Sequence, residues 1–184
     1  LATGYAEGID PVDMGAALLT FEYVRGRMER LEMDLPFTVL IDYMHTEASY
    51  AKGIDMVREL TEGRLITVFG CGGDRDRSSR PVITSIVAGK CDQAIATADN
   101  PRNETIGGIF ADMRQGNEAA ENLSFIEDRR VAIATALEMA RPGDTVLIAG
   151  KGHETFQEFE DCVVPFDDRA IAREILQNKQ WHSR

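Results

Sequence analysis

A glycine turn followed by a run of charged residues is the part of the sequence best suited to bind an anion. Residues 68–80 read V-F-G-C-G-G-D-R-D-R-S-S-R, and the apolar stretch from Leu65 to Phe69 leads directly into them. Glycine permits the sharp turns and close approaches that a ligand site requires, and arginine supplies planar forks that fit a carboxylate or a phosphate. For this segment alone, a tight turn with solvated charges is an equally open interpretation.

Three further polar segments follow apolar stretches in the same way, at residues 42–46, 99–102 and 150–154. The apolar stretches have the length and the aliphatic or β-branched content of strands, so each polar segment should lie at the carboxyl end of a strand. In folds built on parallel strands, ligands bind beyond these ends. The sequence therefore predicts that one edge of a sheet carries the chemistry.

The elements that position these segments alternate regularly after Pro36. Strands are predicted at residues 37–42, 64–69, 92–97, 123–127 and 145–149, and helices at 48–61, 81–90, 104–116 and 129–140. A hairpin or edge strands at 156–166 and a last helix from Asp167 or Asp168 complete the pattern. Apolar strands that alternate with helices indicate a mostly parallel sheet covered on both faces. The predicted fold is α/β, doubly wound and Rossmann-like, with one antiparallel edge strand or hairpin.

The residues ahead of Pro36 follow a different pattern. Asp10 and Pro11 indicate a helix start. The apolar stripe of that helix is expected at Met14, Ala17, Leu18 and Phe21. Because Pro36 ends any helical tendency, we place a domain boundary near residues 31–36. The chain begins with leucine and not with methionine, which suggests a piece of a longer protein, and its last residues are expected to be a frayed polar tail.

Composition narrows the classes of partner. The 184 residues are 43% hydrophobic and carry a formal net charge of -11, which suits a globular domain and argues against binding nucleic acid or a membrane surface. Cys71, Cys91 and Cys162 are an odd number of cysteines without metal-ligand spacing, so we expect reduced thiols in a cytoplasmic protein and no metal site. A nucleophilic role for Cys71 is a weaker alternative, because no neighbouring residue is an obvious base.

These motifs, in this order, resemble the carboxy-terminal domain of the Mur ligases, and within that family the tripeptide synthetases that add meso-diaminopimelate. The matching segments span nearly the whole chain and are residues 26–29 (G-R-M-E), 42–46 (D-Y-M-H-T), 69–77 (F-G-C-G-G-D-R-D-R), 99–102 (D-N-P-R), 128–130 (D-R-R), 149–154 (A-G-K-G-H-E) and 166–169 (F-D-D-R). Arg25, Met44 and Glu47 depart from the family pattern beside these motifs.

The resemblance implies an ATP-dependent amide ligase with three domains. In that family ATP and Mg²⁺ activate a carboxylate of UDP-N-acetylmuramoyl-L-alanyl-D-glutamate as an acyl phosphate, which the incoming amino acid attacks during peptidoglycan biosynthesis. Residues 1–33 would then be the last helices of the central ATPase domain and a linker, and residues 34–184 the amino-acid-binding domain. The amino-terminal and central domains of the same polypeptide would be its partners.

The resemblance also implies which residues bind the substrates. In that family, diaminopimelate is bound by positions that match Arg75, Asp99, Asn100, Pro101, Arg102, Gly150 and Glu154, and the nucleotide is met by positions that match Arg27, Asp42 and His45. The residue types suit this role, because diaminopimelate has two carboxylates for arginine forks and a distal ammonium for Glu154 and the Gly150 carbonyl. Considered alone, Arg102 could be a surface charge after a turn, and His45 a structural histidine.

Three alternatives stay open at this point. They are a lysine-adding Mur ligase, a related folylpolyglutamate or cyanophycin-type ligase domain, and a stand-alone amino-acid-binding module. An arginine at position 102 argues against the first, because it would face the cationic end of lysine. The D-N-P-R and G-C-G-G-D-R-D-R motifs together argue against the second, and the upstream coding sequence would decide the third.

The chain contains no phosphate-binding loop of the form G-x-x-x-x-G-K-[ST]. Its Gly150-Lys151-Gly152-His153 segment lacks the run of backbone amides before the lysine and the hydroxyl after it. We therefore assign no catalytic residue to this chain and expect no ATPase or ligase turnover from it in isolation. Diaminopimelate-dependent phosphate release that survives rigorous purification would contradict this expectation.

Overall fold

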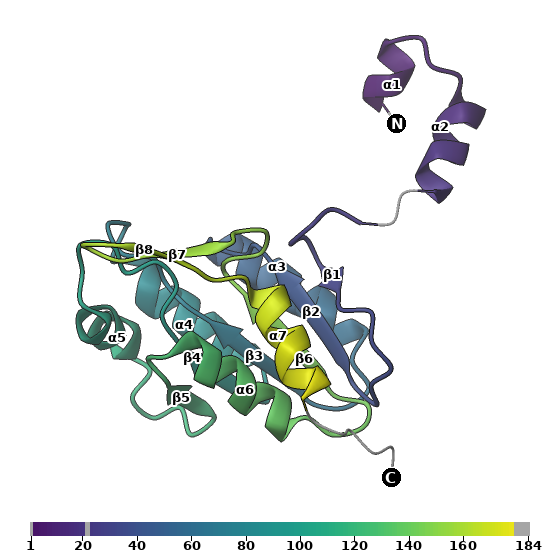
Figure 1. The fold of residues 1–184 in the computed structure, drawn as a ribbon. Helices are drawn as coiled ribbons and strands as arrows, with labels where there is room; N and C mark the ends of the chain where they lie inside the picture. Colours follow the sequence, from purple (N-terminus) through teal and green to yellow (C-terminus); the bar gives the residue numbers. More distant parts are fainter. Residues whose placement is uncertain (1, 21–22, 179–184) are drawn as a thin grey trace.

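The computed structural model describes residues 2–20 and 23–178, and a six-stranded sheet forms the centre of the described part (Figure 1). The strand order is β1-β2-β6-β3-β4-β5. All neighbouring pairs are parallel except β1 with β2. The strands are β1 (Glu29–Arg30), β2 (Thr38–Asp42), β3 (Leu65–Phe69), β4 (Gln93–Ala96), β5 (Leu123–Phe125) and β6 (Thr145–Ala149), with β7 (Phe156–Glu158) and β8 (Val163–Pro165) as a separate antiparallel hairpin.

The helices follow the predicted alternation. They are α1 (Ala2–Ala6), α2 (Pro11–Leu19), α3 (Glu47–Glu59), α4 (Ser79–Lys90), α5 (Ile106–Arg114), α6 (Arg129–Met139) and α7 (Asp168–Gln177). Side-chain oxygens of Thr46, Asp128 and Asp167 accept backbone N–H groups at the starts of α3, α6 and α7, which satisfies donors that a helix leaves unpaired. None of the described helices is long and apolar enough to cross a membrane.

Two hydrophobic cores lie on opposite faces of the sheet. One core packs α3, α4 and α5 against the sheet through residues such as Tyr50, Ile83 and Phe110. The other packs α6 and α7 through residues such as Ile133 and Leu176. Every residue of the central strands β3 and β6 is buried, as expected for parallel strands covered on both sides. The doubly wound α/β fold is therefore confirmed.

The antiparallel edge strand β1 was not predicted, although the hairpin of β7 and β8 was. Glu29 pairs with Ile41 and Arg30 with Leu40, and Leu31 N–H donates to the Val39 carbonyl at 3.0 Å. A strand of two residues carries no hydrophobic period, so only its pairing with β2 defines it. The sheet therefore begins at Glu29, ahead of the boundary expected near residues 31–36.

The first two helices stand apart from the sheet (Figure 1). Asp10 caps α2 as predicted, accepting the Val12 N–H at 2.7 Å. Neither α1 nor α2 contains a buried residue, and Leu19 is 90% exposed. The apolar stripe expected on α2 is thus unburied over its described length. Phe21, which was expected on the same stripe, lies outside the described residues. The polar tail was expected at residues 178–184, and of these the structure describes Asn178, which is the C-cap of α7.

A buried ion pair joins the first turns of α6 and α7. Arg129 donates from Nε to Asp168 Oδ1 at 2.8 Å and from Nη2 to Asp168 Oδ2 at 2.7 Å, and both side chains are fully buried. Arg129 also donates to the carbonyls of Ala98 and Ala149, which lie where the chain leaves β4 and β6. The pair therefore connects the second helical layer to the carboxyl edge of the sheet.

Two truncated chains should show whether α1 and α2 contribute to the stability of the sheet and its covering helices. We expect removal of residues 1–22 to leave the free energy of unfolding nearly unchanged, because α1 and α2 bury none of their residues. Removal of residues 1–31 also deletes β1 and the buried Leu31, and should cost about 2 kcal/mol or more. Urea unfolding of both truncated chains beside the full chain measures the difference. A large loss of unfolding free energy on removal of residues 1–22 would contradict the expectation that α1 and α2 do not stabilise the rest of the chain.

Substitution of Asp168 by alanine should be strongly destabilising. It leaves the Arg129 guanidinium buried without its counter-charge, which should lower the free energy of unfolding by about 3 to 5 kcal/mol. Glu174→Ala is the matched control, because it breaks the exposed Arg130–Glu174 pair between the same two helices and should change stability little. Urea unfolding measures both variants. Equal, small effects would show that the buried pair contributes no more than the exposed one.

Candidate functional site

A cavity of about 500 Å³ opens at the carboxyl ends of β2, β3, β4 and β6. Most of the predicted site residues line it, namely His45, Arg75, Asp99, Asn100, Arg102, Gly150 and Glu154. Arg27, Asp42 and Pro101 are not among the lining residues. The parallel sheet therefore brings together segments that are far apart in the sequence, and all four predicted polar segments contribute to this edge.

The side chains of Arg75 and Arg102 both pass close to Gly72. A Cβ built on Gly72 would stand 3.2 Å from Arg102 Nη1 and 3.6 Å from Arg75 Cγ. Arg102 has a left-handed backbone (φ 51°), and its side chain donates to the Gly73 carbonyl at 2.7 Å and to Glu158 at 2.9 Å. Arg75 is exposed, and no described residue hydrogen-bonds or ion-pairs with its guanidinium. Arg75 is thus a free cation at the cavity.

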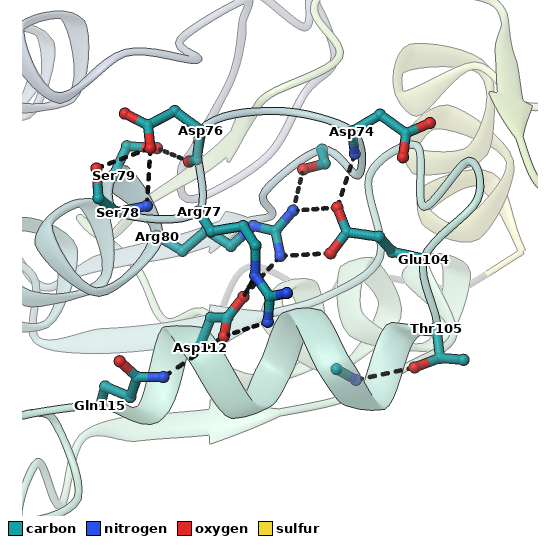
Figure 2. Close-up of polar contacts among 12 residues, drawn as sticks. Asp74, Asp76, Arg77, Ser78, Ser79, Arg80, Glu104, Thr105, Asp112 and Gln115 are labelled. Atoms are coloured by element: carbon teal, nitrogen blue, oxygen red, sulfur yellow. Dashed lines mark hydrogen bonds and ion pairs between the residues drawn. The ribbon is translucent and has the colours of Figure 1, made fainter.

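The other two arginines of the same run are not free, which corrects the expectation that the whole run forms an anion site. Arg77 is bound to Asp112, and Arg80 to Glu104 and Asp112 (Figure 2). These pairs hold the pKa of the Glu104 carboxyl near 2, chiefly through the hydrogen bonds from Arg80. The sequence did not indicate this network, because its carboxylates belong to a later segment, in and just ahead of α5, and meet the arginines only in the folded chain.

The carboxylates of Asp99 and Glu154 also line the cavity, and a buried lysine lies beside them. Lys151 is fully buried, and its Nζ lies 2.9 Å from Asn100 Oδ1, 2.9 Å from Glu154 Oε2 and 3.8 Å from Asp99 Oδ1. Asn100 Nδ2 donates to the same Glu154 oxygen at 2.9 Å. Both bonds use Oε2, so Oε1 has no partner among the described residues. Lys151 therefore holds Asn100 and Glu154 against each other at the edge of the cavity.

Burial opposes the ionisation of Glu154 and of Asp99, but the pKa values of the two carboxyl groups shift in opposite directions. At Glu154 the burial is outweighed by hydrogen bonds from Lys151 and Asn100, so the pKa of this carboxyl is lowered. At Asp99 burial dominates over the attraction of Arg129 and Lys151, and the pKa of Asp99 is raised. Glu154 is therefore the more firmly anionic of the two groups that line the cavity.

Arg27, Asp42 and His45 gather around Tyr43, a residue that the sequence did not single out. The Arg27 guanidinium lies 4.8 Å above the Tyr43 ring, and the His45 ring centre is 4.7 Å away. His45 Nδ1 donates to the Tyr43 carbonyl at 2.9 Å, which leaves Nε2 available. Asp42 Oδ2 accepts the Met28 N–H at 2.7 Å, and burial raises the pKa of Asp42. This cluster presents a cation, an acid and an imidazole nitrogen.

The cluster around Tyr43 and the cavity residues at 150–154 meet where Gly26 packs on Gly152. Gly26 has φ 66°, and a Cβ on it would collide with the backbone of Gly152 and His153. The His153 ring in turn lies 4.8 Å from the Tyr43 ring. The turn that carries Arg27 therefore packs directly on the turn that precedes Glu154, and only glycine permits this approach.

The reactivity of Cys71 bears on the chemistry that this site could perform. Cys71 lines the cavity, but burial raises the pKa of its thiol to about 12, so it is a poor nucleophile. Cys71, Cys91 and Cys162 are all unpaired. Within residues 2–20 and 23–178, no group of three or more His, Cys, Asp or Glu side chains could hold a metal ion.

Comparison with known proteins assigns this chain to a family. The family model described as "Mur ligase, glutamate ligase domain" matches residues 26–152. A UDP-N-acetylmuramoyl-L-alanyl-D-glutamate–2,6-diaminopimelate ligase from Syntrophomonas wolfei is 46% identical over 175 residues, which cover 94% of this chain and 36% of the relative. The protein of the same name from Solibacter usitatus is 41% identical over 182 residues, which cover 98% of this chain and 37% of the relative.

A solved structure agrees with these relatives. The structure of a UDP-N-acetylmuramoyl-L-alanyl-D-glutamate–2,6-diaminopimelate ligase superposes on this chain with a TM-score of 0.79 at 35% identity, covering 97% of this chain and 37% of the solved one. The chain thus spans little more than a third of the length of the relatives it matches, at 36–37%. Because the family model matches most of its residues, the chain belongs to the Mur ligase family.

Proposed function

We propose that the protein containing this chain is an ATP-dependent amide ligase that adds meso-diaminopimelate to UDP-N-acetylmuramoyl-L-alanyl-D-glutamate in peptidoglycan biosynthesis, and that this chain holds the incoming amino acid. One observation carries the proposal. The side chains of Arg75 and Arg102 both pass close to Gly72, in a cavity that Glu154 also lines. Two cations and one anion are the charges that recognise two carboxylates and a distal ammonium. The printed names of the relatives agree with this assignment.

The free atoms of the cavity define how the amino acid is held. The unpartnered guanidinium of Arg75 takes one carboxylate, and the outer edge of Arg102 takes the other as a fork. Glu154 Oε1 and the Gly150 carbonyl accept the ammonium. Gly150 has φ 115°, and a Cβ there would stand 2.6 Å from Asp99 Oδ2. A glycine is therefore needed to bring this carbonyl beside the acidic groups.

Positioning is the contribution of this chain to the reaction. Fixing both ends of the amino acid presents one of its amines to the activated carboxylate, which lowers the entropic part of the barrier. Lys151 keeps Asn100 and Glu154 in one arrangement before the amino acid arrives. Less ordering is then required on binding, so more of the interaction energy remains as affinity and orientation.

ATP supplies the phosphoryl group that activates the carboxylate, and the cluster around Tyr43 fits contact with a nucleotide. Arg27 is exposed and can offset phosphate charge, and Asp42 and His45 can bond ribose hydroxyls. No described group of carboxylates fits a metal ion, so we assign the Mg²⁺ ligands to the remainder of the protein.

The wider organisation follows from the same proposal. Residues 1–33 would be the end of the central domain and the linker, and residues 34–184 the amino-acid-binding domain, with β1 of the linker completing its sheet. The partners would be the amino-terminal and central domains, together with the amino acid, ATP and the UDP-linked dipeptide. We propose a cytoplasmic location, where ATP is present and the unpaired cysteines would stay reduced.

Substitution of Arg102 by alanine in the full-length protein should test the substrate. We expect kcat/KM for meso-diaminopimelate to fall about thirty-fold to a thousand-fold, or roughly 2 to 4 kcal/mol, because a charge-assisted contact in a partly desolvated site is lost. The KM values for ATP and for the UDP-linked dipeptide should change little. Arg75→Ala should act in the same direction without loss of stability, since its side chain has no structural partner.

Arg130→Ala on the outer side of α6 is the control for loss of an arginine, and should leave all three KM values unchanged. Steady-state kinetics with meso-diaminopimelate and with lysine decide the outcome. An unchanged preference for diaminopimelate over lysine in the Arg102 variant would remove the recognition role, and residues 99–102 would then be a structural turn.

A further inference from the structure

Arg80 is a buried arginine that lines the cavity, and protein groups bind both of its terminal nitrogens, Nη1 and Nη2. Its side chain is 1% exposed in the first turn of α4. The guanidinium donates to both oxygens of Glu104 at 2.8 and 2.6 Å, to Asp112 at 2.8 Å and to the Gly72 carbonyl at 3.1 Å (Figure 2). A buried charge is stable only when it is paired in this way. The carboxylates of Glu104 and Asp112 therefore neutralise together a cation that would otherwise face the substrate.

Glu104 also holds the backbone that leads into Arg75. Its Oε1 accepts the Asp74 N–H at 2.7 Å (Figure 2). Asp74 has φ 55°, a left-handed conformation that is unfavourable for a residue with a side chain. Such a conformation persists only where neighbouring contacts hold it. The carboxylate thus fixes the residue immediately before the free cation of the cavity.

The same contacts link the Arg75 loop to the Arg102 segment. Gly73 N–H donates to the Asn100 carbonyl at 2.9 Å, and Arg102 Nη1 donates to the Gly73 carbonyl at 2.7 Å. Asn103 adds a bond from its side-chain amide to Asp74 Oδ2 at 2.6 Å. Glu104 ends this segment. The loop after β3 and the segment after β4 are therefore held against each other at several points, and Glu104 supplies the only carboxylate of the segment that reaches Arg80 among the described residues.

We propose that Glu104 is a positioning residue that determines specificity at the amino-acid site. It holds Arg75 and Arg102 at the separation that the two carboxylates of the amino acid require, and it keeps Arg80 from competing for one of them. This inference rests on the proposed function. The low pKa of Glu104 is consistent with it, because the carboxylate stays ionised throughout the physiological range.

The test is Glu104→Gln in the full-length protein. Glutamine keeps the size of the side chain and one acceptor oxygen but removes one of the two charges that balance Arg80, and leaves that of Asp112. We expect KM for meso-diaminopimelate to rise about 10- to 100-fold, because a small misplacement of binding groups has effects of this size. The preference for meso-diaminopimelate over lysine should fall with it. The KM values for ATP and for the UDP-linked dipeptide should stay within about twofold.

Asp144→Asn is the matched control. Asp144 binds the Arg64 side chain at 2.6 Å and accepts the Arg64 N–H at 2.8 Å, so it also joins an arginine to a backbone amide, but at the opposite end of β3 and β6. This variant should lower the melting temperature by a similar amount without raising KM for meso-diaminopimelate. If Glu104→Gln does not fold, Glu104→Asp keeps the charge but is too short for both Arg80 and Asp74, and should raise the same KM.

The outcomes separate the inference from the proposed function. A wild-type protein that does not add meso-diaminopimelate overturns the proposed function, and this inference falls with it. If the wild type adds it, three results overturn the inference alone: an unchanged KM for meso-diaminopimelate in the Glu104 variant, an equal rise in all three KM values, or an equal rise in the Asp144→Asn control. A selective rise in the Glu104 variant supports it.

Discussion

Three buried cations at the carboxyl edge of the sheet govern how the site is built. Arg80, Arg129 and Lys151 are each at most 1% exposed. A buried charge must be paired, and the pairing of each one joins segments that are distant in the sequence. Arg80 connects the loop after β3 with the segment after β4, Lys151 connects β6 with β4, and Arg129 connects α6 with α7. The loops that carry the site are therefore fastened to one another by charge neutralisation.

This constraint also shows which groups are available to a ligand. Several polar groups already have partners within the fold, including Arg77, the terminal nitrogens of Arg80 and one oxygen of Glu154. Arg75 and the second oxygen of Glu154 have no partner within the described residues. Arg102 uses Nε and Nη1 to bind Glu158 and the Gly73 carbonyl, which leaves its Nη2 available. These groups are therefore the ones we assign to the substrate. A site fixed before binding also loses less entropy when the amino acid enters.

The order of the elements could be predicted from the sequence because it depends on local signals. Apolar runs, helix caps at residues such as Asp10 and Asp128, and breakers such as Pro36 act within a few residues, and they indicated the central parallel strands and the helices between them. Strand β1 could not be predicted, because its two residues become a strand only by pairing with β2. The unburied stripe of α2 shows the same limit, since periodicity indicates a face but not what covers it.

The sequence by itself determined the candidate site as a set of polar segments at one edge of a parallel sheet, because strand ends and glycine turns are local features. It also indicated the family, through motifs in a fixed order. Only the tertiary structure decided which arginine after the glycine turn is free. Glu104 and Asp112 lie 24 to 35 residues beyond the arginines they bind, and their choice of Arg77 and Arg80 over Arg75 depends on how α5 packs beside α4. Charge pairing over such separations is set by the folded geometry and by no local pattern.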